Sequence, residues 1–176
     1  MSKAFTKDDA QGEPLLVPRR APLPAGVPNY VTPGGLALLR AEFVELTAEL
    51  LQVRAASAES DPERARVAAA LGERLAELEA RIGSAELVTA RDDQPNAVRF
   101  GARVTVRNPA GALRTYRIVG VDEANASEGR IAFVAPLARA LLGKRAGEAA
   151  LVRTPQGEEE LELVGFEYDT PSTDER

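Results

Sequence analysis

Carboxylates are the main reactive groups of this sequence, because its 176 residues include no His and no Cys. The chain therefore has no imidazole base, no thiolate nucleophile and no zinc site built on those residues. Three carboxylates, Glu59, Asp61 and Glu63, lie in and beside a polar turn with the sequence SAESDP. Carboxylate oxygens suit Mg²⁺ better than zinc or copper. The alternative is a solvated acidic turn in which Arg64 and Arg66 pair locally.

Two heptad stripes flank this turn and predict the elements that position it. In each stripe the apolar residues follow at steps of 3, 4, 3, 4 and 3. Thr32-Pro33 and Asp61-Pro62 provide helix starts. The sequence predicts an antiparallel coiled-coil hairpin over residues 29–91, whose arms of about 24 residues are roughly 36 Å long. The stripes are Leu36, Leu39, Phe43, Leu46, Leu50 and Val53, then Ala68, Leu71, Leu75, Leu78, Ile82 and Ala85.

A change of apolar period to two at Val98 indicates a second domain, residues 97–168, after a linker at 92–96. Here we expect strands and one short helix that ends at Gly143. The predicted class is therefore α+β, a helical hairpin followed by a small antiparallel sheet. The expected strands are 98–106, 113–121, 130–135, 149–153 and 160–168, with the helix at 136–142.

Both ends of the chain are expected to be tails. Five prolines within residues 1–28 disfavour helix and sheet, so we predict a mobile, partly polyproline-like segment, or alternatively a docking peptide. Residues 169–176 are expected to be frayed. The prolines are Pro14, Pro18, Pro22, Pro24 and Pro28.

Charge and hydropathy narrow the function further. The net charge of −5 argues against binding nucleic acid by charge alone. Residues 29–90 have 6 basic and 10 acidic residues, whereas residues 91–168 have 11 of each. The acidic hairpin therefore indicates either a basic partner surface or no particular partner. No apolar run reaches membrane-spanning length and no signal peptide is recognisable, so we expect a cytoplasmic protein without membrane contact. Phosphate-binding and dinucleotide fingerprints are absent from the sequence, which disfavours a free-standing enzyme.

An ordered set of short motifs covers most of residues 29–168. They are Asn29-Tyr30, Leu78-Glu79-Ala80-Arg81-Ile82, Phe100-Gly101-Ala102, Tyr116-Arg117-Ile118-Val119-Gly120, Asp122-Glu123, Pro136-Leu137-Ala138-Arg139-Ala140-Leu141-Leu142, Thr154-Pro155-Gln156-Gly157-Glu158 and Glu167-Tyr168. The set resembles the Gre family of bacterial transcript-cleavage factors, especially GreB, and the resemblance is strongest in the C-terminal half.

The resemblance implies an FKBP-like C-terminal domain that docks at the rim of the secondary channel of RNA polymerase. It also implies that the hairpin enters that channel and that acidic residues at its tip help hold a second Mg²⁺ in the polymerase site. The polymerase then hydrolyses backtracked RNA. On this basis the chain is a monomeric accessory factor rather than an enzyme. It has no metal or cofactor of its own, and it contacts nascent RNA only indirectly.

The same resemblance supplies the candidate site residues. The tip candidates are Glu59, Asp61 and Glu63. The candidates for docking on the polymerase are Asp122, Glu123, Pro136, Arg139 and Ala140. Structural roles are the alternative: Pro136 begins a helix and Arg139 lies on its exposed side. Three arginines at period-two spacing form either a partner-binding face or a solvated one, namely Arg99, Arg103 and Arg107.

The sequence departs from the family pattern in three places. The acidic tip motif is not intact, since Arg64 and Val67 replace an amide and an aromatic residue. Both arms are about one heptad shorter than in GreB, which removes about 10 Å of reach. Ala135 stands where a polar residue, usually Ser, precedes the short helix, so one helix cap or docking contact is weakened.

Three functional hypotheses follow. The first is a Gre-like factor that binds RNA polymerase and acts on backtracked or arrested complexes. The second lies within the first: we expect transcript cleavage to be weak or absent, so that regulation comes from occupying the channel and displacing full-length Gre factors. The third is a non-cleaving interaction protein that resembles the regulator of nucleoside diphosphate kinase.

Overall fold

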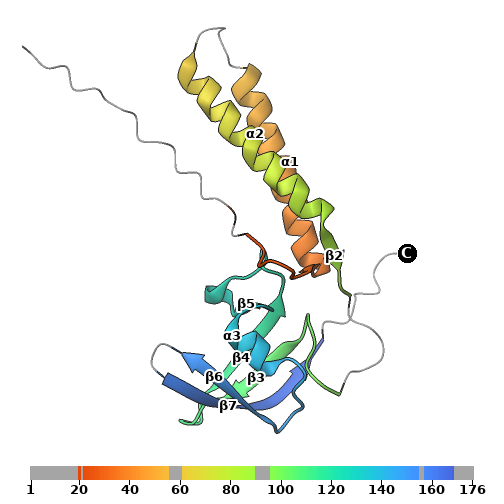
Figure 1. The fold of residues 1–176 in the computed structure, drawn as a ribbon, viewed down its shortest axis with the longest axis vertical. Helices are drawn as coiled ribbons and strands as arrows, with labels where there is room; N and C mark the ends of the chain where they lie inside the picture. Colours follow the sequence, from red (N-terminus) through yellow and green to blue (C-terminus); the bar gives the residue numbers. More distant parts are fainter. Residues whose placement is uncertain (1–19, 21, 56–60, 90–95, 155–156, 169–176) are drawn as a thin grey trace, which may run out of the picture.

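The computed structural model describes residues 20, 22–55, 61–89, 96–154 and 157–168. Two long helices, α1 (Pro33–Ala55) and α2 (Pro62–Gly83), lie side by side and project from a second unit that contains a curled sheet (Figure 1). We call these parts the helix pair and the sheet unit (residues 96–168). Over the described residues the fold combines three α-helices with mostly antiparallel strands, as the mixed class predicted.

Both long helices begin where the sequence predicted. Thr32 precedes α1, and its Oγ1 accepts a 2.9 Å hydrogen bond from the backbone N–H of Gly35. Asp61 is the N-cap of α2, and its carboxylate accepts from the N–H groups of Glu63 and Arg64. These side chains satisfy donors that the first turn of a helix leaves unpaired. Pro33 and Pro62 then suit the first turn, where the missing N–H costs nothing.

The helix pair is held together by the two heptad stripes. All twelve apolar residues of those stripes belong to one cluster, together with Val31 and Val67. Leu78 is fully buried and Leu39 is 2% exposed, so the seam between α1 and α2 excludes water where these two residues lie, near the base of the pair. The arms contain 23 and 22 residues, close to the predicted 24.

A short parallel strand pair at the base of the helix pair was not predicted. β1 (Asn29–Val31) pairs with β2 (Ala85–Leu87), so the segment before α1 lies beside the segment after α2. The sequence had placed both segments in the hairpin and Ala85 at the end of a helical stripe. Instead, α2 stops at Gly83, and the N–H of Ser84 closes the last turn on Ala80 and Ile82. Asn29 Nδ2 then donates to the Arg81 carbonyl at 2.8 Å.

The larger sheet has the strand order β5-β4-β3-β7-β6. The expectation of an antiparallel sheet is wrong at one edge, because β5 runs parallel to β4. A parallel neighbour needs a crossover connection rather than a tight turn, and the short 3₁₀ helix η1 (Ala126–Glu128) lies in that connection. The strands are β3 (Arg103–Arg107), β4 (Leu113–Val119), β5 (Arg130–Ala132), β6 (Ala149–Thr154) and β7 (Gly157–Glu167).

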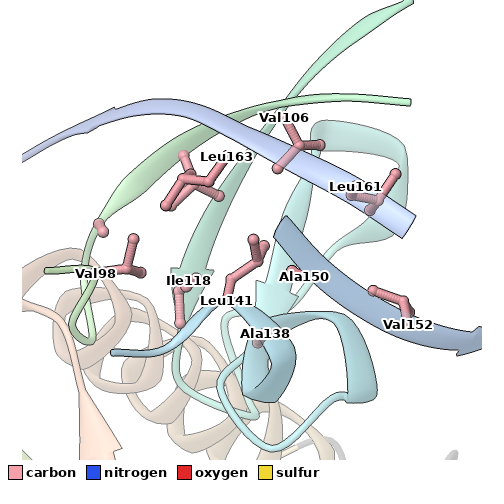
Figure 2. Packing of buried hydrophobic residues seen from close by; sticks show 11 residues of the cluster. Val98, Val106, Ile118, Ala138, Leu141, Ala150, Val152, Leu161 and Leu163 are labelled. Carbon is pink, nitrogen blue, oxygen red and sulfur yellow. The ribbon is translucent and has the colours of Figure 1, made fainter. Parts of the chain in front are cut away.

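The core of the sheet unit lies between one face of this sheet and α3 (Pro136–Leu141). Figure 2 shows Ala138 and Leu141 of α3 directed toward Ile118 and Leu163 of the sheet, and all four are fully buried. α3 ends just before Gly143, which has a φ of 81°. This left-handed conformation is the one that glycine adopts most easily at a helix end. The predicted helix stop is therefore confirmed.

Two details of the sheet unit concern the sequence predictions. The first strand begins at Arg103 rather than Val98, because Gly101 (φ 86°) turns the chain and its N–H bonds to the Ile118 carbonyl at 2.9 Å. Val98 is nevertheless buried, as its apolar character suggested. Ala135 occupies the N-cap of α3 and makes no side-chain capping bond, as predicted.

Several predictions made from the sequence fall on residues outside the described ranges. They are the tail up to residue 19, Glu59 and most of the polar turn, the linker at 92–95, the turn at 155–156 and the C-terminal tail. The end of the predicted N-terminal tail is described. There Val27 N–H closes a turn on the Pro24 carbonyl at 3.2 Å, and Arg20 makes the ion pairs treated below.

Candidate partner-binding sites

Two of the three tip candidates lie at the start of α2, at the end of the helix pair farthest from the sheet unit (Figure 1). Besides capping the helix, Asp61 lies 3.2 Å from Arg64 Nε. Glu63 lies 3.6 Å from Arg66 Nη1. Both carboxylates are exposed, so these local ion pairs are weak and yield to a stronger partner. Glu59, the third candidate, lies outside the described residues.

Two of the three docking candidates on α3 face solvent. Pro136 and Arg139 are exposed and Ala140 is half-buried. The buried face of the same helix is formed by Ala138 and Leu141, which anchor it on the sheet. A six-residue helix with one buried and one exposed face presents a small, rigidly supported surface, as a docking element requires.

The other two docking candidates are inside the molecule. Asp122 follows β4, and its side chain is 8% exposed. Its Oδ1 accepts a 2.7 Å hydrogen bond from Arg20 Nη1, and its Oδ2 lies 3.5 Å from Arg81 Nη1 of α2. This carboxylate therefore joins the sheet unit to the helix pair. A role in contacting a partner directly stays a prediction.

Glu123 is 7% exposed and lies beside the first turn of α1. Thr32 Oγ1 donates a 2.6 Å hydrogen bond to Glu123 Oε2 while it caps that turn. A Cβ added at Gly35 would lie 2.6 Å from the same carboxylate oxygen, so glycine leaves room for the contact. On the backbone side, Arg130 Nε donates to the Glu123 carbonyl at 2.9 Å. Asp122 and Glu123 are adjacent in sequence but contact different helices of the pair, α2 and the start of α1 respectively.

Close packing accompanies these polar contacts. A Cβ added at Gly120 would lie 2.6 Å from the Tyr30 carbonyl oxygen, which is too close for any side chain. Tyr30 also contacts two aromatic rings of the sheet unit, Phe100 and Phe133, with ring centroids 5.8 and 5.5 Å away. We call the whole contact region between the helix pair and the sheet unit the junction, and it includes Tyr30, Thr32, Asp122 and Glu123.

The pKa values of Arg20 and Glu42 are shifted from their ordinary values. Burial opposes the charge of Arg20, but hydrogen bonds to Asp122 and Glu42 outweigh it and raise the pKa of the guanidinium. Burial likewise opposes ionisation of Glu42. Hydrogen bonds from Arg20 and Arg74 outweigh this effect and lower the pKa of Glu42 below its ordinary value of 4.5. Both groups are therefore charged at neutral pH.

Sequence reasoning missed the residues that build the junction from the helix side, namely Arg20, Thr32, Glu42 and Arg81. Thr32 was recognised as a helix cap, which uses only part of its bonding capacity. Arg20 and Arg81 are separated from Asp122 by 102 and 41 positions, and no local pattern marks such partners. The adjacent pair Asp122-Glu123 was noticed, but as a surface feature.

The predicted basic face on the sheet is partly neutralised. Arg103 lies 3.5 Å from Glu167, and Arg107 donates to Glu162 at 2.9 Å across β3 and β7. Arg99 precedes the strand rather than continuing it. The exposed face of β3 therefore alternates charge with its neighbour β7.

Residues 20, 22–55, 61–89, 96–154 and 157–168 contain no group of three or more Asp and Glu side chains arranged to hold a metal ion. In the same residues no helix combines the length and apolarity that crossing a bilayer requires.

Comparison with known proteins places the chain in a family. The protein-family model described as "Transcription elongation factor, GreA/GreB, C-term" matches residues 93–168 of the sequence. Transcription elongation factor GreB from Pseudomonas aeruginosa is 38% identical over 168 residues, covering 85% of this chain and 95% of the relative. GreB from Neisseria meningitidis serogroup B is 31% identical over 153 residues, covering 80% and 94%. A solved structure of GreA/GreB from Nitrosomonas europaea is 19% identical and covers 81% of this chain and 99% of that one, with a TM-score of 0.40.

A protein built from a helix pair and a sheet unit, with the sheet unit matched by this family model, belongs to a class of transcription factors that act during elongation. Because the GreB relative from Pseudomonas aeruginosa aligns over almost its whole length, the assignment extends to the helix pair. The chain is a member of the GreA/GreB family of transcription elongation factors.

Proposed function

We propose that this chain is an accessory factor that binds RNA polymerase at its secondary channel and acts on backtracked or arrested complexes. In this proposal α1 and α2 form an antiparallel coiled coil that enters the channel, and the sheet unit is FKBP-like and docks on the rim. The observation that carries the proposal is the position of Asp61 and Glu63 at the far end of a rigid helix pair, remote from the sheet unit (Figure 1).

Docking is assigned to α3. Pro136 and Arg139 lie on the exposed side of this helix, Ala140 is half-buried at its edge and packs against the core, and Ala138 and Leu141 fix the helix on the sheet. The carboxylates of Asp122 and Glu123 are engaged within the junction, so their part in docking is indirect. Arg139 is the residue best suited to a charged contact with the polymerase.

Transcript cleavage is expected to be weak. Any Mg²⁺ belongs to the polymerase, and the carboxylates of the factor help only if they reach it. Arms of 23 and 22 residues are about 34 Å long at 1.5 Å per residue. An arm one heptad shorter than that of GreB loses about 10 Å, whereas a carboxylate–metal bond spans only about 2 Å. Asp61 is in addition used as a helix cap.

The decisive test uses stalled elongation complexes with labelled RNA. The chain is added alone and then in competition with a full-length GreB. We expect competition with GreB, and little RNA shortening by the chain itself. Strong shortening that disappears in Asp61→Asn with Glu63→Gln would contradict the expectation of weak cleavage. Failure to bind core polymerase would refute the whole proposal.

Docking through α3 has a matched control. Arg139→Glu reverses the charge at the proposed contact, and we expect at least about a tenfold loss of polymerase affinity, typical for removing a charged interface contact. Arg153→Glu makes the same change on β6, where the side chain is 86% exposed, and should bind normally. Equal effects of the two variants would show that net charge, rather than α3, controls binding.

A second candidate is a channel-binding regulator with no cleavage activity, similar to the regulator of nucleoside diphosphate kinase. The use of Asp61 as a helix cap and the local pairing of Glu63 with Arg66 favour it. A complete lack of RNA shortening at saturating factor, with competition retained, would select this candidate over weak cleavage.

A further inference from the structure

Arg20 connects the two parts of the molecule although it lies in neither. It precedes β1 and belongs to no helix or strand. Its Nη1 donates to Asp122 of the sheet unit at 2.7 Å, and its Nη2 donates to Glu42 of α1. The side chain is 20% exposed, so water screens these contacts only partly.

Two arginines of α2 extend this connection. Arg81 lies 3.5 Å from the second oxygen of Asp122, and Arg74 donates to Glu42 at 3.0 Å. Arg74, Glu42, Arg20, Asp122 and Arg81 therefore form a chain of alternating charge that begins and ends on α2. Each carboxylate lies between two guanidinium groups.

From these contacts we infer that Arg20 is a positioning residue that fixes the angle between the helix pair and the sheet unit. A guanidinium presents separate N–H groups in a rigid fork, so it holds two carboxylates at a defined separation. One of these carboxylates moves with α1 and the other with the sheet unit. Any change of angle between the two parts must break or stretch one of the two contacts.

The location of the contact on α1 makes it effective. Thr32 and Glu123 hold the beginning of α1 against the sheet unit at 2.6 Å, and they act as a pivot. Glu42 lies ten residues further along, about 15 Å from that pivot. The far end of α1 is about 34 Å from the pivot, so slack of 1 Å at Glu42 becomes about 2 Å at the far end. Contacts at the pivot restrain such rocking much less.

Arg20 thereby has a part in the working protein. If the proposed function holds, Arg20 directs the far end of the helix pair toward the polymerase site once the sheet unit has docked. The restraint by Arg20 on the angle between the two parts does not depend on the polymerase. Its test is therefore carried out on the free protein, and its failure is distinguishable from failure of the proposed function.

Distances between two spin labels measure the angle directly. The chain has no Cys, so labels attach only where Cys is introduced. Ala69→Cys on the exposed side of α2 and Leu151→Cys on β6, which is 57% exposed, place one label on each part. The pulsed dipolar distance distribution is compared in the full-length chain, with Arg20→Gln, Arg20→Lys and the control Arg40→Gln, which alters an exposed side chain of α1.

We expect Arg20→Gln to broaden the distribution about twofold or more, as for a released hinge. Arg20→Lys should retain part of the restraint, and Arg40→Gln should leave the distribution unchanged. Glu42→Gln, which removes the other end of the same contact, should broaden it similarly. Circular dichroism verifies that every variant keeps its helices. A distribution in folded Arg20→Gln that superimposes on the parent would overturn the inference, as would equal broadening in Arg40→Gln.

Discussion

Replacing Asp61 separates a structural role of this carboxylate from a role in chemistry. Asp61→Ala removes the acceptor for the N–H groups of Glu63 and Arg64 and also the ion pair with Arg64. Asp61→Asn keeps an oxygen acceptor in the same place and removes only the charge. If the main role in the free protein is to cap α2, the two variants differ clearly in stability.

The magnitudes follow from the geometry. Loss of an N-cap Asp costs about 1 kcal/mol of the free energy of unfolding. The ion pair joins two side chains that are 47% and 42% exposed, and such surface pairs contribute about 0.3–0.5 kcal/mol. We therefore expect Asp61→Ala to lose about 1.5 kcal/mol and Asp61→Asn about 0.5 kcal/mol. With a urea slope of about 2 kcal/mol per molar, the midpoints fall by about 0.7 and 0.2 M.

Urea unfolding followed by circular dichroism at the helix band measures both midpoints. Glu63→Gln is the matched control, because it removes a neighbouring charge without touching the cap, and it should change the midpoint by less than about 0.2 M. The reasoning is refuted if Asp61→Asn is as unstable as Asp61→Ala, since charge would then matter more than the cap. An unchanged midpoint in Asp61→Ala refutes it as well.

Three further outcomes follow from the structure. Gly120→Ala places a Cβ 2.6 Å from the Tyr30 carbonyl, and we expect it to lower the free energy of unfolding by about 1–3 kcal/mol by strain at the junction, measured by urea unfolding. Leu78→Ala empties a fully buried site between the long helices and should cost about 2–5 kcal/mol in the same assay. The pKa of Glu42 is lowered in the folded protein, so its ionised form stabilises the fold at pH values above the ordinary pKa of 4.5. This contribution is lost as the pH falls through the lowered pKa. The difference in melting temperature between the parent and Glu42→Gln should therefore shrink on acidification below 4.5, and a constant difference would contradict it.

Much of the fold was predictable because its signals are local. Thr32-Pro33, Asp61-Pro62 and Gly143 each mark a helix end through the chemistry of a few neighbouring atoms. The heptad stripes predicted the seam between α1 and α2 because side chains at steps of 3 and 4 share one helix face. The tip candidates Asp61 and Glu63 came from the acidic turn and from the family resemblance, and their role at the tip stays a prediction.

The misjudged elements depend on pairing and turns that the apolar pattern does not specify. Strand β5 lies parallel to β4, and β1 lies parallel to β2, and no apolar period marks the direction in which two strands pair. A strand of three residues has too few residues to show a period, so the apolar pattern does not reveal β1 and β2. The start of β3 was placed too early because alternation continues through Gly101, which turns the chain.

The amino-acid sequence by itself determined which chemistry is open to this protein, and where its two long helices begin and how they pair. Absence of His and Cys is a property of composition, and helix caps and heptads act over one or two turns. Only the tertiary structure decided the roles of Asp122 and Glu123. These side chains are buried by Arg20, Arg81 and Thr32, from segments 41 to 102 positions away. Burial and ion pairing are settled by which segments meet in space, and that meeting places two candidate docking carboxylates in contacts between the sheet unit and the helix pair, while their part in docking stays a prediction.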